Sequence, residues 1–125
     1  MTSAIARSCK KVPFSVERRA RFCSIAEVLG ASGYTTILSG KWHIAPDPLE
    51  IGFQHYYGVN LAPFYFKRDV IGEERDKAPH PLKLQDDRVD GKTLPDDWYS
   101  TTAYTDYGIK TIKEQALDKG KPFFL

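Results

Sequence analysis

The sequence predicts an α/β protein, and three successive features support this prediction. A helix is expected over residues 24–33, a short buried strand over 34–38 and a polar loop over 39–43. A helix, a strand and a polar loop in this order are typical of layered α/β domains. A second helix from about residue 100 to Gly120, followed by the apolar strand 123–125, repeats the helix–strand order.

The first helix has a defined start and end. Ser24 and Glu27 fit the S-x-x-E capping box, in which side chain and backbone satisfy each other's hydrogen bonds in the first turn. Gly33 is expected to end the helix in the left-handed conformation. Apolar residues at spacings of three and four predict one buried face, formed by Ile25, Val28 and Leu29.

The strand over 34–38 is rich in β-branched residues and is expected to be buried. It leads into the polar loop at its carboxyl end, which is the edge where open α/β sheets bind ligands. Between Ile44 and Trp98, prolines and glycines interrupt every periodicity, so a long irregular region is expected. The aromatic residues of 53–66 either line a substrate pocket or pack in the core.

The second helix is expected to be capped by Ser100 or Thr101 and to end at Gly120. Its spacing predicts a single packed face. The residues expected on that face are Tyr104, Tyr107, Gly108, Ile109, Ile112 and Ala116.

The composition divides the chain into a basic leader, residues 1–22, and a domain over 23–125. The first 21 residues carry six basic side chains and one acidic, whereas the rest carry twelve and fifteen. The leader is a targeting peptide, a nucleic-acid arm or an unrelated start of the reading frame. The net charge of +2 does not indicate nucleic acid, and no apolar run is long enough to span a membrane.

The most informative motif for chemistry is Gly40-Lys41-Trp42-His43, directly after the expected strand. In an extended backbone, residues two apart point to the same side, so Lys41 and His43 would converge on one anion while Trp42 packs inward. A cation beside a titratable hydrogen-bonding group suits sulfuryl or phosphoryl transfer. Judged from the residues alone, the alternative is an ordinary surface lysine and a partly buried histidine.

Several motifs share order and spacing with one known family. They are Ile25-Ala26-Glu27-Val28-Leu29, Gly33-Tyr34, Gly40-Lys41-Trp42-His43, Gly52-Phe53, Tyr57-Gly58, the segment from Trp98 to Tyr107, and Lys121-Pro122-Phe123-Phe124-Leu125. Together they resemble the type I sulfatases, the arylsulfatase family within the alkaline phosphatase superfamily. The resemblance runs from Cys23 to the end of the chain.

The resemblance implies a fold, a reaction and two site residues. The fold would be part of a three-layer sheet-and-helix domain, with 23–125 as a partial sulfatase catalytic domain. In such enzymes Lys41 would contact the substrate sulfate and the formylglycine nucleophile, and His43 would hydrogen-bond the formylglycine hydroxyl. Calcium would hold the sulfate oxygens. The substrates would be small sulfate esters or sulfated carbohydrates, with no nucleic acid and no membrane as partner.

The chain also departs from the family. The formylglycine motif C/S-x-P-S-R is missing, because Cys9 is followed by Lys10 and Lys11, and Gln54 stands where the family has Asp. No residue is assigned as a metal ligand. We therefore expect an internal fragment that is inactive alone. Family members are mostly exported, periplasmic or lysosomal, but no signal in the chain indicates its location.

Two other functions stay open. One is a phosphodiesterase or phosphonate hydrolase of the same superfamily, and the other is a non-catalytic, truncated interaction protein. His55 and His80 are expected to be packing or surface residues. The acidic pairs Glu73-Glu74, Asp86-Asp87 and Asp96-Asp97 are expected to be solvated rather than metal-binding.

Overall fold

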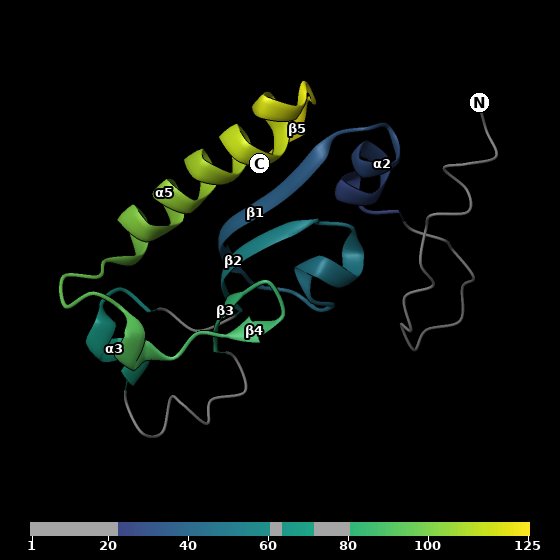
Figure 1. The fold of residues 1–125 in the computed structure, drawn as a ribbon. Coiled ribbons are helices and arrows are strands. Elements are labelled where there is room, and N and C mark those ends of the chain that lie inside the picture. The colour runs from purple at the N-terminus through teal and green to yellow at the C-terminus, as the bar shows by residue number, and fades with distance from the viewer. Residues whose placement is uncertain (1–22, 61–63, 72–80) are drawn as a thin grey trace, which may run out of the picture.

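The structure is a computed structural model, and it describes residues 23–60, 64–71 and 81–125 (Figure 1). The predicted leader, His80 and the pair Glu73-Glu74 lie outside the described residues. The elements are, in order, α2 (Ile25–Ala31), β1 (Thr35–Trp42), η1 (Pro48–Ile51), β2 (His55–Asn60), α3 (Lys67–Ile71), β3 (Leu82–Leu84), β4 (Asp87–Arg88), η2 (Gly91–Thr93), α5 (Ser100–Thr111), η3 (Ile112–Ala116), η4 (Leu117–Lys119) and β5 (Phe123–Phe124).

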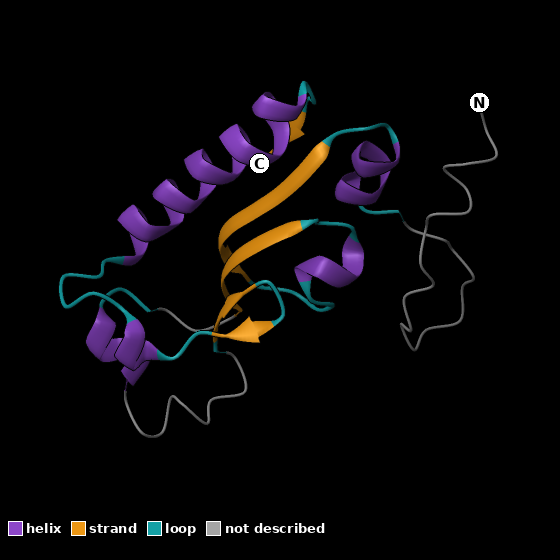
Figure 2. Ribbon diagram, in the orientation of Figure 1, coloured by secondary structure: helices purple, strands orange, loops and turns teal. Residues whose placement is uncertain are grey.

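The strands form one five-stranded mixed sheet in the order β4-β3-β2-β1-β5 (Figure 2). β1 runs parallel to β2 and to β5, while β3 pairs antiparallel with β2 and with β4. The predicted α/β class is therefore confirmed. No helix of the described segments has the length and hydropathy that a bilayer crossing needs.

On the two faces of the sheet, side chains of β1 form hydrogen bonds with different elements. Ser39 Oγ donates to the Tyr104 carbonyl of α5 at 2.6 Å, and Thr36 Oγ1 donates to the Gly52 carbonyl after η1 at 2.8 Å. Odd and even positions of a strand point to opposite faces. α5 and η1 consequently lie on opposite sides of the central strand.

The first helix begins as predicted, and Val28 and Leu29 of its expected buried face are partly buried, but Ile25 is not. Ser24 Oγ accepts from the Glu27 amide at 3.0 Å, and the Ser24 amide donates to Glu27 Oε2 at 2.9 Å, so the capping box is confirmed. Gly33 has φ 92°, as expected after a helix end. Ile25, however, is 60% exposed, whereas Ala26 is fully buried.

Close backbone packing explains this difference in α2. A Cβ on Gly52, which follows η1, would lie 2.8 Å from the Glu27 Cα. The helix backbone therefore lies close to the main chain at Gly52, next to the small buried Ala26, and the larger Ile25 faces outward.

The first strand is longer than predicted, because β1 continues to Trp42. The predicted loop residues up to Trp42 are in the sheet, and only His43 follows the strand. Gly40 has φ 127° and pairs in register with Gly58. A Cβ on Gly58 would overlap the Gly40 carbonyl group, lying 2.8 Å from its carbon. Glycine at both positions lets the two strands approach closely here, so Gly58, in the region expected to be irregular, belongs to a strand.

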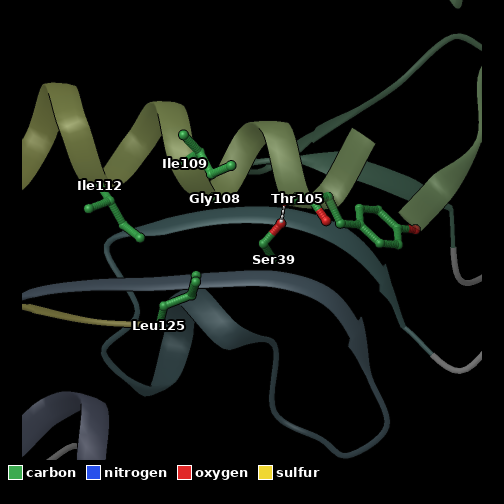
Figure 3. Close-up of a pocket in the computed structure, with 7 residues that line it drawn as sticks. Ser39, Thr105, Gly108, Ile109, Ile112 and Leu125 are labelled. Atoms are coloured by element: carbon green, nitrogen blue, oxygen red, sulfur yellow. Dashed lines mark hydrogen bonds between the residues drawn. The ribbon is translucent and has the colours of Figure 1, made fainter. Parts of the chain in front are cut away.

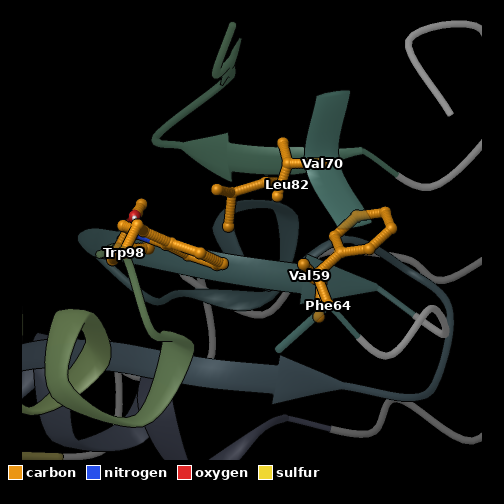
Figure 4. Close-up of a cluster of buried hydrophobic side chains, with 6 residues drawn as sticks. Val59, Phe64, Val70, Leu82 and Trp98 are labelled. Carbon is orange, nitrogen blue, oxygen red and sulfur yellow. Dashed lines mark hydrogen bonds between the residues drawn. The ribbon is translucent and has the colours of Figure 1, made fainter. Parts of the chain in front are cut away.

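The region predicted to be irregular contains a central strand. β2 occupies residues 55–60, with its four inner residues buried, and β3 and β4 extend the sheet beyond it. One hydrophobic cluster forms around β2 (Figure 4). Its members are Tyr57, Val59, Phe64, Val70, Leu82 and Trp98. Several of the aromatics of 53–66 are thus core residues.

The second helix differs from the prediction at its start and on its packed face. Its N-cap is Tyr99, without a side-chain hydrogen bond, whereas Ser100 is the first helical residue and is buried. Tyr104 and Tyr107 pack on Tyr57 as partly buried residues, but Ile109 is 62% exposed. The helix continues through a π-helical turn, η3, and ends as predicted at Gly120, with φ 62°.

Candidate anion-binding site

Lys41 and His43 lie at the carboxyl end of β1. Lys41 is paired in register with Val59, and Trp42 with Asn60, while His43 is the first residue after the strand. Both side chains are exposed. Within the described part of the chain, neither has a hydrogen-bond or ion-pair partner. Both groups are therefore available to a ligand.

Trp42, which lies between these two residues in the chain, is held in place by a ring contact and a hydrogen bond. Its ring meets Phe53 edge-on with centroids 5.9 Å apart, and its Nε1 donates to the Pro46 carbonyl at 2.9 Å. Phe53 in turn stacks on Phe124 of β5. The expected inward packing of Trp42 is confirmed, and it holds the backbone that carries Lys41 and His43.

The loop after the site is tied to β3 by an ion pair. Lys83 Nζ lies 2.8 Å from Asp47 Oδ2, and the Asp47 amide donates to Glu50 Oε2 at 3.0 Å. Asp47 is the carboxylate that follows Lys41 most closely in the sequence. Among the described residues, Asp47 forms its ion pair with Lys83 and none with Lys41.

Three buried polar atoms of the described residues have no hydrogen-bond partner: Tyr56 OH, Asn60 Oδ1 and Tyr104 OH. Asn60 is the register partner of Trp42 at the end of β2. Burial raises the pKa of both tyrosines, helped at Tyr56 by the Asp47 charge. The two phenols therefore remain neutral, and they add no negative charge to this part of the sheet.

The described residues do not form a binding site for a metal ion. They contain no group of three or more His, Cys, Asp or Glu side chains placed to hold one. Asp96 instead pairs with Lys67 at 2.7 Å, while Asp86 and Asp87 are exposed around the turn between β3 and β4. Calcium binding, which the resemblance implied for the family, has no support in this part of the chain.

A separate hollow of about 270 Å³ lies between α5 and the C-terminal residues (Figure 3). Its lining is mainly apolar and includes Ile109, Ile112 and Leu125, with Ser39 of β1 at its floor. Neither Lys41 nor His43 belongs to this lining. The hollow is therefore distinct from the candidate anion site.

Phe66, Arg68 and Tyr99 form an exposed stack of side chains. The Phe66 and Tyr99 rings are 5.5 Å apart, and the Arg68 guanidinium lies 4.9 Å from the Phe66 centroid. Sequence patterns did not predict this group, because Phe66 and Tyr99 are distant in the chain. The only signal was the abundance of aromatics over 53–66.

His55 begins β2 opposite Ile37 and is half-buried, so its expected role as a packing or surface residue is consistent with its position. Burial and the positive charge of Lys119 lower the pKa of His55 below its ordinary value of 6.5. The folded state thus takes up this proton less readily than the unfolded state, and stability must fall as the pH drops below about 6.5.

We expect His55→Gln to reduce this loss of stability on acidification. The free energy of unfolding, measured by urea denaturation between about pH 7.5 and pH 5.5, should fall less in the variant than in the wild type. Lys119→Gln, which removes the second cause, should act in the same direction but less strongly. Equal pH dependence of His55→Gln and wild type would contradict the prediction.

These features define a mixed α/β protein in which two exposed side chains, Lys41 and His43, lie at the carboxyl end of a parallel strand. The sequence matches no protein-family model. It is 32% identical over 109 residues to an arylsulfatase from Klebsiella aerogenes, an alignment that covers 83% of this chain and 22% of the arylsulfatase. The chain is a distant homologue of the arylsulfatases and corresponds to part of a sulfatase-family protein. It spans about a fifth of the length of this relative.

Proposed function

We propose that Lys41 and His43 bind the sulfate group of a sulfate ester, within the partial catalytic domain 23–125 of a sulfuric ester hydrolase. The observation that carries this proposal is a pair of exposed side chains at the end of β1 that have no hydrogen-bond or ion-pair partner among the described residues, in a chain homologous to arylsulfatase. Residues 1–22 would be a leader outside this domain.

The chemistry of the two side chains suits this role. A lysine ammonium offers three donors to sulfate oxygens, and an imidazole N–H offers a further one. Hydrogen bonds between charged partners are stronger than neutral ones, and preorganised donors stabilise charge without reorganisation. The Trp42 contacts supply that preorganisation here. In sulfatases formylglycine and a divalent cation supply attack and charge neutralisation; the residues described here would bind and orient the anion.

Lys41→Ala is expected to weaken sulfate binding by about tenfold, the equivalent of one charge-assisted hydrogen bond partly exposed to water. The dissociation constant can be measured by titrating the chain with sodium sulfate at constant ionic strength and following amide resonances of residues 40–44. The resonances that move in the wild type should be those at the end of β1.

Lys113→Ala serves as a control, because Lys113 is an exposed lysine of η3. It should leave the sulfate affinity unchanged, which separates a site effect from a loss of net charge. A Lys41→Ala variant with wild-type sulfate affinity would remove Lys41 from the site. A parallel titration with phosphate tests the phosphoryl-transfer alternative, which would predict tighter phosphate than sulfate binding.

A further inference from the structure

An ion pair connects the loop that follows His43 to β3, which is two strands away from β1 (Figure 1). Its partners are Lys83 of β3 and Asp47, the residue before η1, and the Lys83 Nζ lies 2.8 Å from the Asp47 Oδ2. The Lys83 side chain is 27% exposed and the Asp47 side chain 22%. Because water screens a partly buried ion pair less than one on an open surface, this pair is expected to hold the two segments together.

The alternation of side chains along β3 directs Lys83 toward this loop. Its neighbour Leu82 packs in the hydrophobic cluster with Tyr57, whose ring contacts Tyr104 of α5. Consecutive residues of a strand point to opposite faces of the sheet. Lys83 therefore points to the face opposite α5, which is the face where η1 and Asp47 lie.

His43 is the first residue of a short loop that is fixed at both ends. At its start, Trp42 is the last residue of β1, and the Trp42 Nε1 donates across the loop to the Pro46 carbonyl at 2.9 Å. Asp47 follows Pro46 directly and forms the ion pair with Lys83. Only residues 43–45 lie between these two fixed points, so a change at Asp47 is transmitted to His43 through a very short segment.

We propose that Lys83 is a positioning residue for His43, because its ion pair with Asp47 fixes the loop from which His43 binds the anion. The inference rests on the proposed function, since it takes His43 to bind sulfate. Lys83 itself needs no contact with the ligand. Its effect is to order His43 in advance, which lowers the entropy lost when the anion binds.

Lys83→Met is expected to weaken sulfate binding by about threefold, the effect of having to order one side chain on binding. Methionine keeps much of the apolar length of lysine but cannot form the ion pair, whereas Lys83→Arg can form it and should bind sulfate like the wild type. The dissociation constant is measured on the full 125-residue chain by titration with sodium sulfate at constant ionic strength. Amide resonances of residues 40–44 report the binding. Wild-type affinity of Lys83→Met would overturn the proposal.

Lys67→Met is the matched control for the change in charge. It also removes one lysine charge and one ion pair, that of Lys67 with Asp96 at 2.7 Å, but this pair is not attached to the loop of His43. Sulfate affinity should be unchanged in this variant. A loss as large as that of Lys83→Met would show a general effect of net charge and would contradict the positioning role.

Asp47→Asn separates positioning from direct attraction of the anion by Lys83. Asparagine keeps an oxygen for the Leu49 amide, which donates to the Asp47 Oδ1 at 3.4 Å, but it carries no charge for the ion pair. If Lys83 attracted sulfate by its own charge, removal of the carboxylate would strengthen binding. Positioning predicts that Asp47→Asn weakens binding by the same factor as Lys83→Met, and that the double variant binds no more weakly than either. Unchanged or tighter binding by Asp47→Asn would refute the positioning role.

A second pair of double variants tests whether the effect of Lys83 passes through His43. In a His43→Ala background, Lys83→Met should cause no further loss of sulfate affinity, because the side chain that it positions is absent. In a Lys41→Ala background it should still weaken binding by about threefold, since His43 remains. A loss that persists in the His43→Ala background would contradict the proposal, and so would no loss in the Lys41→Ala background.

The single variants distinguish failure of this inference from failure of the proposed function. If neither Lys41→Ala nor His43→Ala changes the sulfate affinity, the proposed function is wrong and the positioning role with it. If both weaken binding while Lys83→Met and Asp47→Asn do not, the positioning role alone is wrong.

Discussion

Gly58→Ala is expected to lower the free energy of unfolding by about 3 kcal/mol, the upper end of the usual range for overpacking, because the new methyl group would overlap the main chain of the neighbouring strand. The Cβ would lie 2.8 Å from the Gly40 carbonyl carbon and closer still to its oxygen. A backbone group cannot rotate away as a side chain would. β1 and β2 would have to separate at the pair that precedes Lys41, so sulfate affinity should fall as well. Urea denaturation followed by circular dichroism measures the loss of stability.

Gly30→Ala is the matched control for this substitution. The nearest heavy atom to its Cβ would be 3.8 Å away, at Gln54, which is ordinary van der Waals contact. Since alanine favours a helix over glycine by about 1 kcal/mol, this variant should be as stable as the wild type or more stable. Similar effects of the two substitutions would show that the close approach of β1 and β2 is not the cause.

Trp98→Ala is expected to cost about 3–5 kcal/mol, the usual range for removing a large buried aromatic side chain. Trp98 is 6% exposed and packs in the cluster around Val59. Its Nε1 also donates to the Tyr57 hydroxyl at 3.2 Å, a buried hydrogen bond that the substitution removes. The loss can be measured as a shift of the urea midpoint at constant slope.

Leu84→Ala provides the comparison, because Leu84 belongs to β3 but is 45% exposed. Its substitution should change stability by no more than about 0.5 kcal/mol. If Trp98→Ala were equally mild, the cluster would not be the main core of this part of the chain.

Local signals were sufficient for the start of α2 and for the helix ends at Gly33 and Gly120, but not for the start of α5, the length of β1 or the existence of β2. The capping box at Ser24 and the left-handed glycines at 33 and 120 depend on neighbouring residues alone, and each was predicted correctly. β2 was missed because glycine and histidine interrupt its pattern, and its stability comes from pairing with β1 and β3. Ile25 was wrongly assigned to the buried face of α2 because close approach at Gly52 favours Ala26 over Ile25, a tertiary effect.

In the candidate site, too, some features could be predicted from the local sequence and others could not. The position of Lys41 and His43 at a strand end followed from a contiguous motif, and the inward packing of Trp42 followed from alternation along an extended chain. The joint binding of an anion by these two residues stays a prediction. The ring contact of Phe66 with Tyr99 joins residues far apart in the sequence, so only the folded chain reveals it.

The short pairing of β5 with β1 has a consequence for the site. β5 pairs with β1 only at Thr35 and Thr36, so in the described segments no strand lies beside the outer edge of β1 from Ile37 to Lys41. Among the described strands, β2 alone therefore holds the end of β1 that carries Lys41, through the pairs Lys41–Val59 and Trp42–Asn60.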